Sequence, residues 1–176
     1  VTVPYKEAIV PFLNSLESKA WRIGAVNTVV KEDRPEASGT LSREISMWSP
    51  TEHRYGRLKG YNTDAHGFFR ALMDDADFDP ENKVAVLLGA GGVARAVGYI
   101  LIEAGVKSLV ILNRKIERAN TLADILIQHA KAPQNIAARA WQEENVRRII
   151  PMADLIVNCT ILGMKHSQGE GISPIS

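Results

Sequence analysis

Short apolar runs alternate with stretches of helical periodicity along the second half of the chain. Residues 84–88 are apolar throughout, which is typical of a strand buried on both faces of a parallel sheet. The pattern predicts strands and helices in alternation, at 83–88, 92–103, 108–112, 116–130, 136–140, 143–149 and 155–158. This rhythm favours an α/β fold with a doubly wound parallel sheet.

The first half of the chain is less regular. Apolar residues at helical spacing predict a helix over 6–16, and a β-branched run predicts a strand over 23–30. The segment 57–61 is expected to return beside that strand as a hairpin, and 65–73 carries the apolar stripe of a helix. We therefore expect a smaller α/β unit ahead of the regular one.

The connection between the two strands predicted in the first half, residues 31–59, is long for a hairpin. It is rich in charge and carries Pro35, Gly39 and Pro50, which favours an exposed insertion. Because it also holds apolar residues, extended hairpin strands, a lid or a subunit contact stay open as alternatives.

A glycine-rich turn follows the apolar run 84–88 and reads Gly89-Ala90-Gly91-Gly92-Val93-Ala94. In such a turn Gly89 permits the tight bend, Gly91 lets a phosphate approach the backbone, and Ala94 takes the third small position. Free amides at the helix start and the positive end of its dipole form an anion site. The pattern predicts binding of a dinucleotide pyrophosphate, although a glycine turn can also be purely steric.

The strand predicted next ends in Asn113-Arg114-Lys115. An NAD-binding domain carries an acidic residue near this position for the ribose 2′-hydroxyl. Here the position holds an amide and cations, and Arg114, with Lys115 and Arg118 close by, suits a 2′-phosphate. The segment favours NADP over NAD, and a solvated basic loop is the alternative.

The composition narrows the class of protein. With 21 basic and 20 acidic side chains the net charge is +1, and nothing in it indicates a nucleic-acid or membrane partner. No apolar run approaches the roughly twenty residues that span a bilayer, and no signal peptide is evident. Cys159 is the single cysteine and cannot form an internal disulfide. The histidines show no ligand spacing with it, so we expect no metal. A protein of the reducing cytoplasm that binds a small molecule is favoured.

Three polar residues of the first half follow strand-like runs: Lys6, Asn27 and Asp64. A lysine beside a carboxylate suits reversible hydride transfer, because a proton must join or leave the oxygen as the hydride moves at carbon. Lys6 could exchange that proton, and Asp64 could orient the substrate hydroxyl. On residue types alone, a solvated lysine, an N-cap aspartate and a turn asparagine are the more frequent interpretations.

Several segments, in chain order, together resemble the shikimate dehydrogenase family. They read TVPYK from Thr2, GAVNT from Gly24, GYNTDAHG from Gly60, GAGGVARA from Gly89, NR from Asn113 and VNCTILGM from Val157. The resemblance covers nearly the whole chain except 31–59, where the family usually has a short turn, and the final polar stretch. Motifs in a fixed order are far more specific than any one of them.

The resemblance implies reduction of 3-dehydroshikimate to shikimate with NADPH, a step in making aromatic amino acids. It implies that Lys6 and Asp64 are catalytic and that Thr2 and Asn27 also contact the substrate. Together with the glycine and basic motifs, it gives these expected cofactor contacts: Gly89, Ala90, Gly91, Gly92, Val93, Ala94, Asn113, Arg114, Lys115, Arg118, Thr160, Gly163 and Met164. Lys115 departs from the family's usual small hydroxyl residue at this position.

We expect residues 1–65 to form part of a substrate-binding and catalytic domain, and 66–176 to form a Rossmann-like NADP-binding domain. The family's serine pair for the substrate carboxylate is expected before Val1. Its substrate-binding glutamine and the helix that returns to the first domain are expected after Ser176. The chain therefore reads as a fragment of a family member.

Two other functions stay open. A quinate/shikimate dehydrogenase shares the lysine and the aspartate, and the carboxylate end of the pocket decides between the two substrates. A non-catalytic, dehydrogenase-like metabolite sensor is expected to lose the pair, whereas Lys6 and Asp64 are both present. The sequence leaves the choice between a monomer and a homodimer open.

Overall fold

The computed structural model describes residues 1–2, 4–32, 57–130, 135–165, 167 and 169–175. The chain divides into two compact units, Val1–Thr63 and Asp64–Ser176. The assignment of a substrate domain to 1–65 and of an NADP domain to 66–176 stays a prediction.

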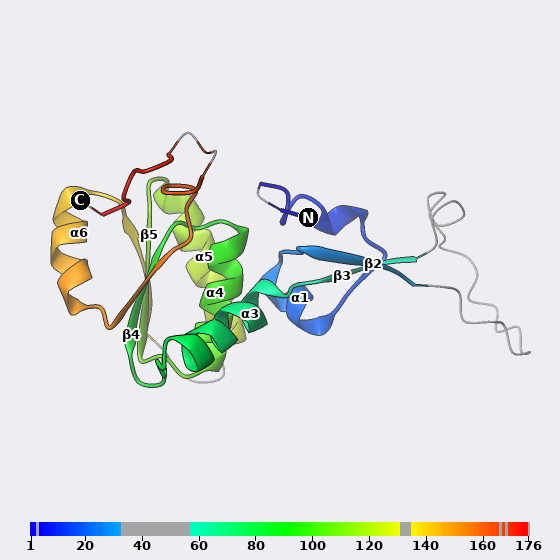
Figure 1. Ribbon diagram of the computed structural model, residues 1–176, viewed down its shortest axis with the longest axis horizontal. Helices are drawn as coiled ribbons and strands as arrows, with labels where there is room; N and C mark the ends of the chain where they lie inside the picture. Colours follow the sequence, from blue (N-terminus) through cyan, green and yellow to red (C-terminus); the bar gives the residue numbers. More distant parts are fainter. Residues whose placement is uncertain (3, 33–56, 131–134, 166, 168, 176) are drawn as a thin grey trace, which may run out of the picture. The chain divides into compact units, whose positions relative to one another are not determined.

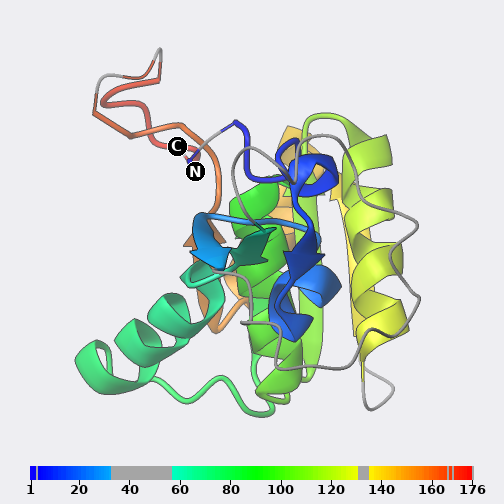
Figure 2. The ribbon, with the colours of Figure 1, turned by 90° about the vertical axis from the view of Figure 1, so that its right-hand side faces the viewer.

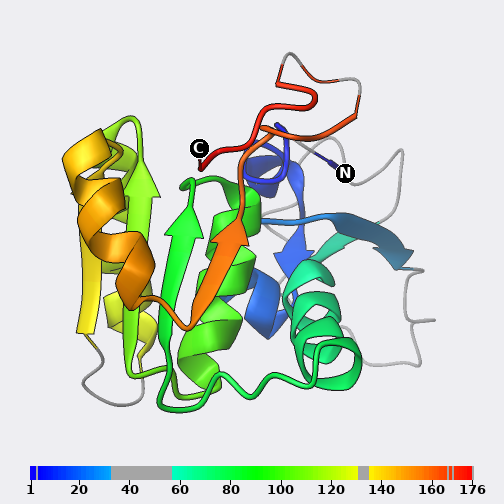
Figure 3. The same ribbon diagram turned by 60° about the vertical axis from the view of Figure 1, so that its left-hand side comes forward.

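The second unit is built on a parallel sheet with the strand order β6-β5-β4-β7. Its strands are β4 (Val84–Leu88), β5 (Ser108–Asn113), β6 (Asn135–Ala140) and β7 (Leu155–Asn158). Figure 3 shows the arrows of β4, β5 and β7 pointing the same way. The chain steps outward from β4 to β6 and then crosses back to place β7 on the other side of β4, so the strand order reverses between β4 and β7.

Helices cover both faces of this sheet, as Figure 1 shows. They are α4 (Gly92–Glu103) and α5 (Ile116–His129) on one face and α6 (Glu143–Ile149) on the other. On the α6 face, the buried residues Val86, Leu88 and Leu112 pack with Trp141 and Val146. The predicted α/β fold with a Rossmann-like parallel sheet is confirmed, because apolar strands buried on two sides require helices over both faces.

Helix α3 (Asp64–Arg70) opens the second unit and runs directly into a π-helical turn, η2 (Ala71–Asp75). It packs against α4. The helix predicted over 65–73 is therefore present, with Asp64 as its first residue.

The first unit contains a small mixed sheet with the order β1-β3-β2 (Figure 2). Strand β1 (Ser15–Leu16) runs parallel to β3 (Arg57–Tyr61), and β2 (Thr28–Glu32) runs antiparallel to it. The predicted pairing of the two longer segments is confirmed. The ends of the predicted insertion, 31–32 and 57–59, lie in β2 and β3, whereas 33–56 fall outside the described residues.

The helix predicted over 6–16 is wrong. The structure has turns there, a short 3₁₀ helix η1 (Val10–Phe12) and then β1. Asn14 binds β3 twice, since its N–H donates to the Leu58 carbonyl at 2.9 Å and its Oδ1 accepts from the Leu58 N–H at 2.6 Å. This pairing with a distant strand holds the chain extended and overrides the local periodicity.

The start of the strand predicted over 23–30 is also wrong. Ile23 ends a helix, α1 (Ser18–Ile23), which Glu17 caps by accepting hydrogen bonds from the N–H groups of Lys19 and Ala20. Gly24 ends the helix in the left-handed conformation, with φ of +67°. The strand therefore begins only at Thr28, the first residue of β2.

Candidate functional site

The carboxyl ends of three neighbouring strands meet at one edge of the sheet in the second unit (Figure 3). Leu88 at the end of β4 lies in register with Leu112 of β5 and with Asn158 of β7. The Gly89 N–H donates to the Leu112 carbonyl at 2.8 Å, and the Cys159 N–H donates to the Leu88 carbonyl at 2.9 Å. Backbone bonds therefore tie the ends of the strands together where the strand order reverses, the place where open α/β sheets bind ligands.

The glycine turn has a backbone that only glycine adopts easily at its first position. Gly89 has φ of +107°, and a Cβ there would lie 3.1 Å from Thr160 Cγ2 and 3.2 Å from the Cys159 carbonyl oxygen. A Cβ on Gly91 would meet nothing within 4 Å, so the backbone at Gly91 borders open space. The predicted tight turn at Gly89 is present, and the room at Gly91 is what close approach of a phosphate requires.

The remaining residues of this turn lead into α4. Gly91 is its N-cap and has no side chain with which to cap the first turn, where Gly92 and Val93 lie half-buried. Ala90 and Ala94 are buried. A helix start without a side-chain cap suits a bound anion, which would accept from its amides.

The basic segment follows the end of β5. Asn113 is the last residue of that strand, and its Nδ2 donates to the Lys115 carbonyl at 2.7 Å. Lys115 is the N-cap of α5, and the Arg118 N–H donates to the same carbonyl at 3.2 Å. The side chains of Arg114, Lys115 and Arg118 are exposed. The cations therefore begin two residues after Leu112, whose carbonyl binds the glycine turn, and they lie beside the positive end of the α5 dipole.

Asn158, at the end of β7, organises the loop that follows. Its Oδ1 accepts from the Thr160 N–H at 3.0 Å and from the Thr160 hydroxyl at 2.7 Å, and its Nδ2 donates to the Leu162 carbonyl at 2.9 Å. Sequence reasoning gave Asn158 no role. The signal that could have found it is an asparagine at a strand end with a threonine two residues later, a pattern typical of side-chain-closed turns.

The same loop carries Gly163 and Met164, for which cofactor contacts are predicted. Gly163 has φ of +83°, and the Met164 side chain is 51% exposed. The Ser167 hydroxyl lies 2.9 Å from the Ile161 carbonyl oxygen and 2.8 Å from that of Met164, so it holds the far side of the loop. Burial raises the pKa of the Cys159 thiol to about 12, which keeps it protonated at neutral pH.

In the first unit, backbone bonds gather three segments around the end of β3. The Val26 N–H donates to the Lys6 carbonyl at 2.7 Å, and the Asn27 N–H donates to the Tyr61 carbonyl at 3.1 Å. The Tyr5 N–H donates to the Thr2 carbonyl at 2.9 Å, which closes the turn that leads to Lys6. Thr2, Lys6 and Asn27, all predicted to contact the substrate, thus lie on segments that this unit connects.

Thr63 fixes the side chain of Asn27. The Asn27 Nδ2 donates to the Thr63 hydroxyl at 2.9 Å, and the Thr63 N–H donates to Asn27 Oδ1 at 3.1 Å. The Thr28 hydroxyl donates to the same Oδ1 at 3.0 Å. Sequence reasoning missed the role of Thr63 toward Asn27, since 36 residues separate the two in the chain.

Asp64 follows Thr63 in the chain and is the first residue of α3, in the second unit. Both Lys6 and Asp64 are half-buried. Because they belong to different units, their action as a pair stays a prediction.

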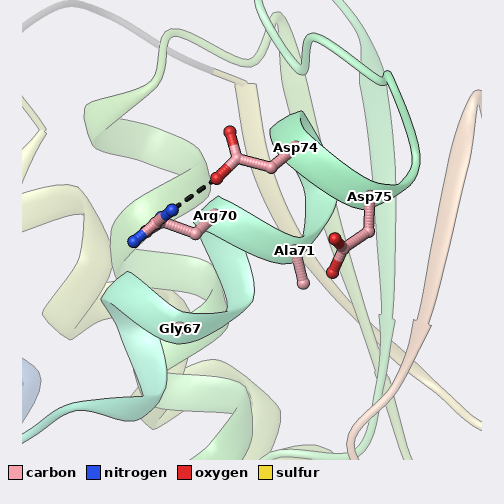
Figure 4. Close-up of a pocket in the computed structure, with 5 residues that line it drawn as sticks. All are labelled: Gly67, Arg70, Ala71, Asp74 and Asp75. Carbon is pink, nitrogen blue, oxygen red and sulfur yellow. Dashed lines mark hydrogen bonds and ion pairs between the residues drawn. The ribbon is translucent and has the colours of Figure 1, made fainter.

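A pocket of about 240 Å³ lies on α3 and η2 (Figure 4). It is lined by Gly67, Arg70, Ala71, Asp74 and Asp75. Arg70 Nε and Asp74 Oδ2 form an ion pair at 3.0 Å, and both side chains are more than half exposed. None of the predicted site residues lines this pocket, and its charged, exposed lining differs from the mostly apolar lining of ligand sites.

Within the described part of the chain, no group of three or more His, Cys, Asp or Glu side chains lies close enough to hold a metal ion. No helix in that part is both long and apolar enough to cross a membrane.

Two family descriptions match the chain. "Shikimate dehydrogenase substrate binding domain" matches residues 1–29. "Shikimate / quinate 5-dehydrogenase" matches residues 74–163, just over half of the chain.

Individual proteins are similar over most of the chain. The shikimate dehydrogenase (NADP(+)) of Moorella thermoacetica is 46% identical over 164 residues, which make up 93% of this chain and 47% of that protein. The structure of shikimate 5-dehydrogenase from Thermus thermophilus, in complex with NADP(H) and shikimate, is 34% identical with a TM-score of 0.65, covering 99% of this chain and 51% of that one.

A quinate dehydrogenase is also similar in structure. The enzyme from Corynebacterium glutamicum, in complex with NAD, is 30% identical with a TM-score of 0.69, covering 93% of this chain and 49% of that one. The chain spans about half the length of the curated relatives it matches.

Proposed function

Because the chain belongs to the shikimate/quinate 5-dehydrogenase family, we propose that its protein reduces 3-dehydroshikimate to shikimate with NADPH. The resemblance seen in the sequence is confirmed by this membership. One observation carries the proposal: at the edge where β4, β5 and β7 end, the glycine turn lies between the basic segment and the Thr160 loop. That edge carries the open backbone at Gly91, the exposed cations of the basic segment and an exposed methionine.

The residues of this edge fit NADP. We assign the pyrophosphate to the start of α4, where the backbone at Gly91 borders open space. We assign the 2′-phosphate to Arg114, with Lys115 and Arg118 as additional cations. Met164 would lie beside the nicotinamide. The cofactor supplies the hydride, and these residues bind and orient it.

We assign the groups for the substrate oxygens to residues of the first unit and to Asp64, the first residue of the second unit. Reduction of a ketone requires a proton on oxygen as the hydride reaches carbon, and we assign that proton to the Lys6 ammonium. Asp64 orients the hydroxyl that forms. Thr2 and Asn27 bind other substrate oxygens, and Thr63 holds the Asn27 amide in one orientation.

Quinate/shikimate dehydrogenase is the second candidate, and the Corynebacterium glutamicum structure favours keeping it. Arg114 and its neighbours weigh against NAD as the main cofactor. Oxidation rates with quinate and with shikimate, each with NAD+ and with NADP+, separate the two enzymes.

The experiment that tests the proposal follows NADPH absorbance with 3-dehydroshikimate for the wild-type protein, for Lys6→Ala and for Lys19→Ala. Lys19 is an exposed lysine of the same unit outside the predicted site. We expect Lys6→Ala to lower kcat by about 10²- to 10⁴-fold because it removes the proton donor. NADP+ affinity should change little, since the lysine is not assigned to the cofactor.

Lys19→Ala should keep the wild-type rate. Full activity of Lys6→Ala would overturn the assignment of the proton donor. NADP+ and shikimate binding without turnover by the wild-type protein would instead support a metabolite sensor.

A further inference from the structure

The loop after β7 rests on two side chains that bond to each other. Asn158 accepts from the Thr160 N–H and hydroxyl through one oxygen, and its Nδ2 donates to the Leu162 carbonyl. The Thr160 hydroxyl in turn accepts from the Leu162 N–H at 3.1 Å. The hydroxyl of Thr160 is therefore engaged within the loop, both as donor and as acceptor.

The methyl group of Thr160, by contrast, lies against the glycine turn. Its Cγ2 would be 3.1 Å from a Cβ on Gly89, closer than ordinary van der Waals contact. The Cys159 carbonyl oxygen lies almost as close, at 3.2 Å from the same position. The turn after β4 and the loop after β7 are thus in direct contact, and the conformation of one limits that of the other.

Beyond this contact the loop presents apolar side chains outward. Ile161 is 45% exposed and Met164 is 51% exposed. The Met164 N–H donates to the Ile161 carbonyl at 3.2 Å, so the two share one turn. An exposed apolar turn at the end of a sheet is a surface against which a flat ring can pack.

We propose that Asn158 is a positioning residue for the cofactor: it acts through Thr160 and Leu162 to hold the 158–164 loop against the glycine turn. In this arrangement Thr160 serves the cofactor through its methyl group and its backbone, and not through its hydroxyl. The proposal rests on the proposed function, because it takes the dinucleotide as the ligand of this edge.

A double-mutant cycle in the intact protein tests this role. NADP+ affinity is measured by calorimetric titration for the wild-type protein, Asn158→Ala, Thr160→Val and the double variant. We expect each single change to weaken NADP+ binding by about tenfold, since each breaks the same hydrogen-bonded unit. The double variant should bind no more weakly than the weaker single variant.

Asn145→Ala is the matched control. Asn145 lies in α6, and its Nδ2 donates to the Ala140 carbonyl at 2.9 Å. This hydrogen bond has the same length as the one that Asn158 Nδ2 donates to the Leu162 carbonyl. We expect this variant to lose thermal stability without losing NADP+ affinity. Asn158→Asp, which keeps the acceptor for Thr160 and loses the donor to Leu162, should recover part of the affinity that Asn158→Ala loses.

The outcomes separate the two proposals. If the wild-type protein binds NADP+ and the two single losses multiply in the double variant, Thr160 acts independently of Asn158 and the positioning role is overturned. An equal loss of affinity in Asn145→Ala overturns it as well, since general destabilisation would then explain the effect. A wild-type protein that does not bind NADP+ overturns the proposed function and the positioning role with it.

Discussion

The two units of the chain place their candidate functional groups by different means. In the second unit, backbone hydrogen bonds from Gly89 to Leu112 and from Cys159 to Leu88 bring the loops together. In the first unit, a side chain bond between Asn27 and Thr63 orients the group assigned to the substrate. The proposed anion site therefore depends on the backbone of the sheet itself, whereas the proposed substrate side depends on individual hydroxyl and amide groups.

The largest effect is expected where the backbone of the second unit cannot accept a side chain. Gly89→Ala places a Cβ at φ of +107° and within 3.2 Å of a backbone oxygen. We expect it to lower the free energy of unfolding by about 2 kcal/mol or more and to abolish NADP+ binding. Urea unfolding and calorimetric titration measure the two effects.

Gly91→Ala is the control for that comparison, because a Cβ at Gly91 would meet no atom within 4 Å. Its stability should stay within about 0.5 kcal/mol of the wild-type value, while NADP+ binding weakens, since the methyl group occupies the space assigned to the phosphate. Wild-type affinity in Gly91→Ala would place the pyrophosphate elsewhere.

A smaller effect is expected at the basic segment. Arg114→Ala should weaken NADP+ binding by about 10- to 30-fold, because a charge-assisted hydrogen bond is lost, and should leave NAD+ binding nearly unchanged. Titration of the variant with each nucleotide measures this. Arg139→Ala, which removes an exposed cation of β6, is the matched control. An equal loss for NAD+ and NADP+ would remove Arg114 from the 2′-phosphate site.

On the substrate side, removal of one hydroxyl should have a selective effect. Thr63→Val deletes the oxygen that accepts from Asn27. We expect the KM for shikimate to rise by about 3- to 10-fold with NADP+ affinity unchanged, and Thr63→Ser to restore the wild-type KM. Steady-state kinetics with each substrate varied separates the two constants. No recovery in Thr63→Ser would mean that the shape of Thr63, and not its hydroxyl, orients Asn27.

The smallest effect is expected at the N-cap of α1. Desolvation alone would raise the pKa of Glu17, but hydrogen bonds from Ser18, Ala20 and Lys19 outweigh it and hold the pKa below its ordinary value. A lowered pKa in the folded state means that ionised Glu17 stabilises the first unit above its unfolded-state pKa, and that this contribution disappears as the pH falls through the folded-state pKa.

Glu17→Ala should therefore lower the free energy of unfolding by about 0.5 kcal/mol at neutral pH. The difference from the wild-type protein should shrink below the unfolded-state pKa of about 4.3. Thermal melts across this pH range check it. A difference that grows toward acid pH would contradict the lowered pKa.

The sequence predicted the second unit well because its signals are local. The apolar run 84–88 is typical of a buried strand, and the glycine turn directly after it marks the start of α4, where we propose the anion site. The hydrogen bond between Asn158 and Thr160 could also have been predicted from the sequence, because the two residues lie only two positions apart.

The first unit was harder to predict because distant contacts decide it. Hydrogen bonds to Leu58, 44 residues away, hold the chain extended at Asn14. The surrounding residues therefore form no long helix, although their apolar positions have helical spacing. Thr63 and Asn27 are likewise far apart in the chain. No local pattern indicates either contact. The predicted pairing of Lys6 with Asp64 rests on the resemblance to the family and stays a prediction.

Above all, we propose that the edge of the second unit binds NADP and selects it by its additional phosphate. Calorimetric titration of the wild-type protein with NADP+ and with NAD+ tests this most directly. We expect NADP+ to bind at least about tenfold more tightly than NAD+, because Arg114 and its neighbours meet the 2′-phosphate. Equal affinity for the two nucleotides, or no binding of NADP+, would contradict the proposal.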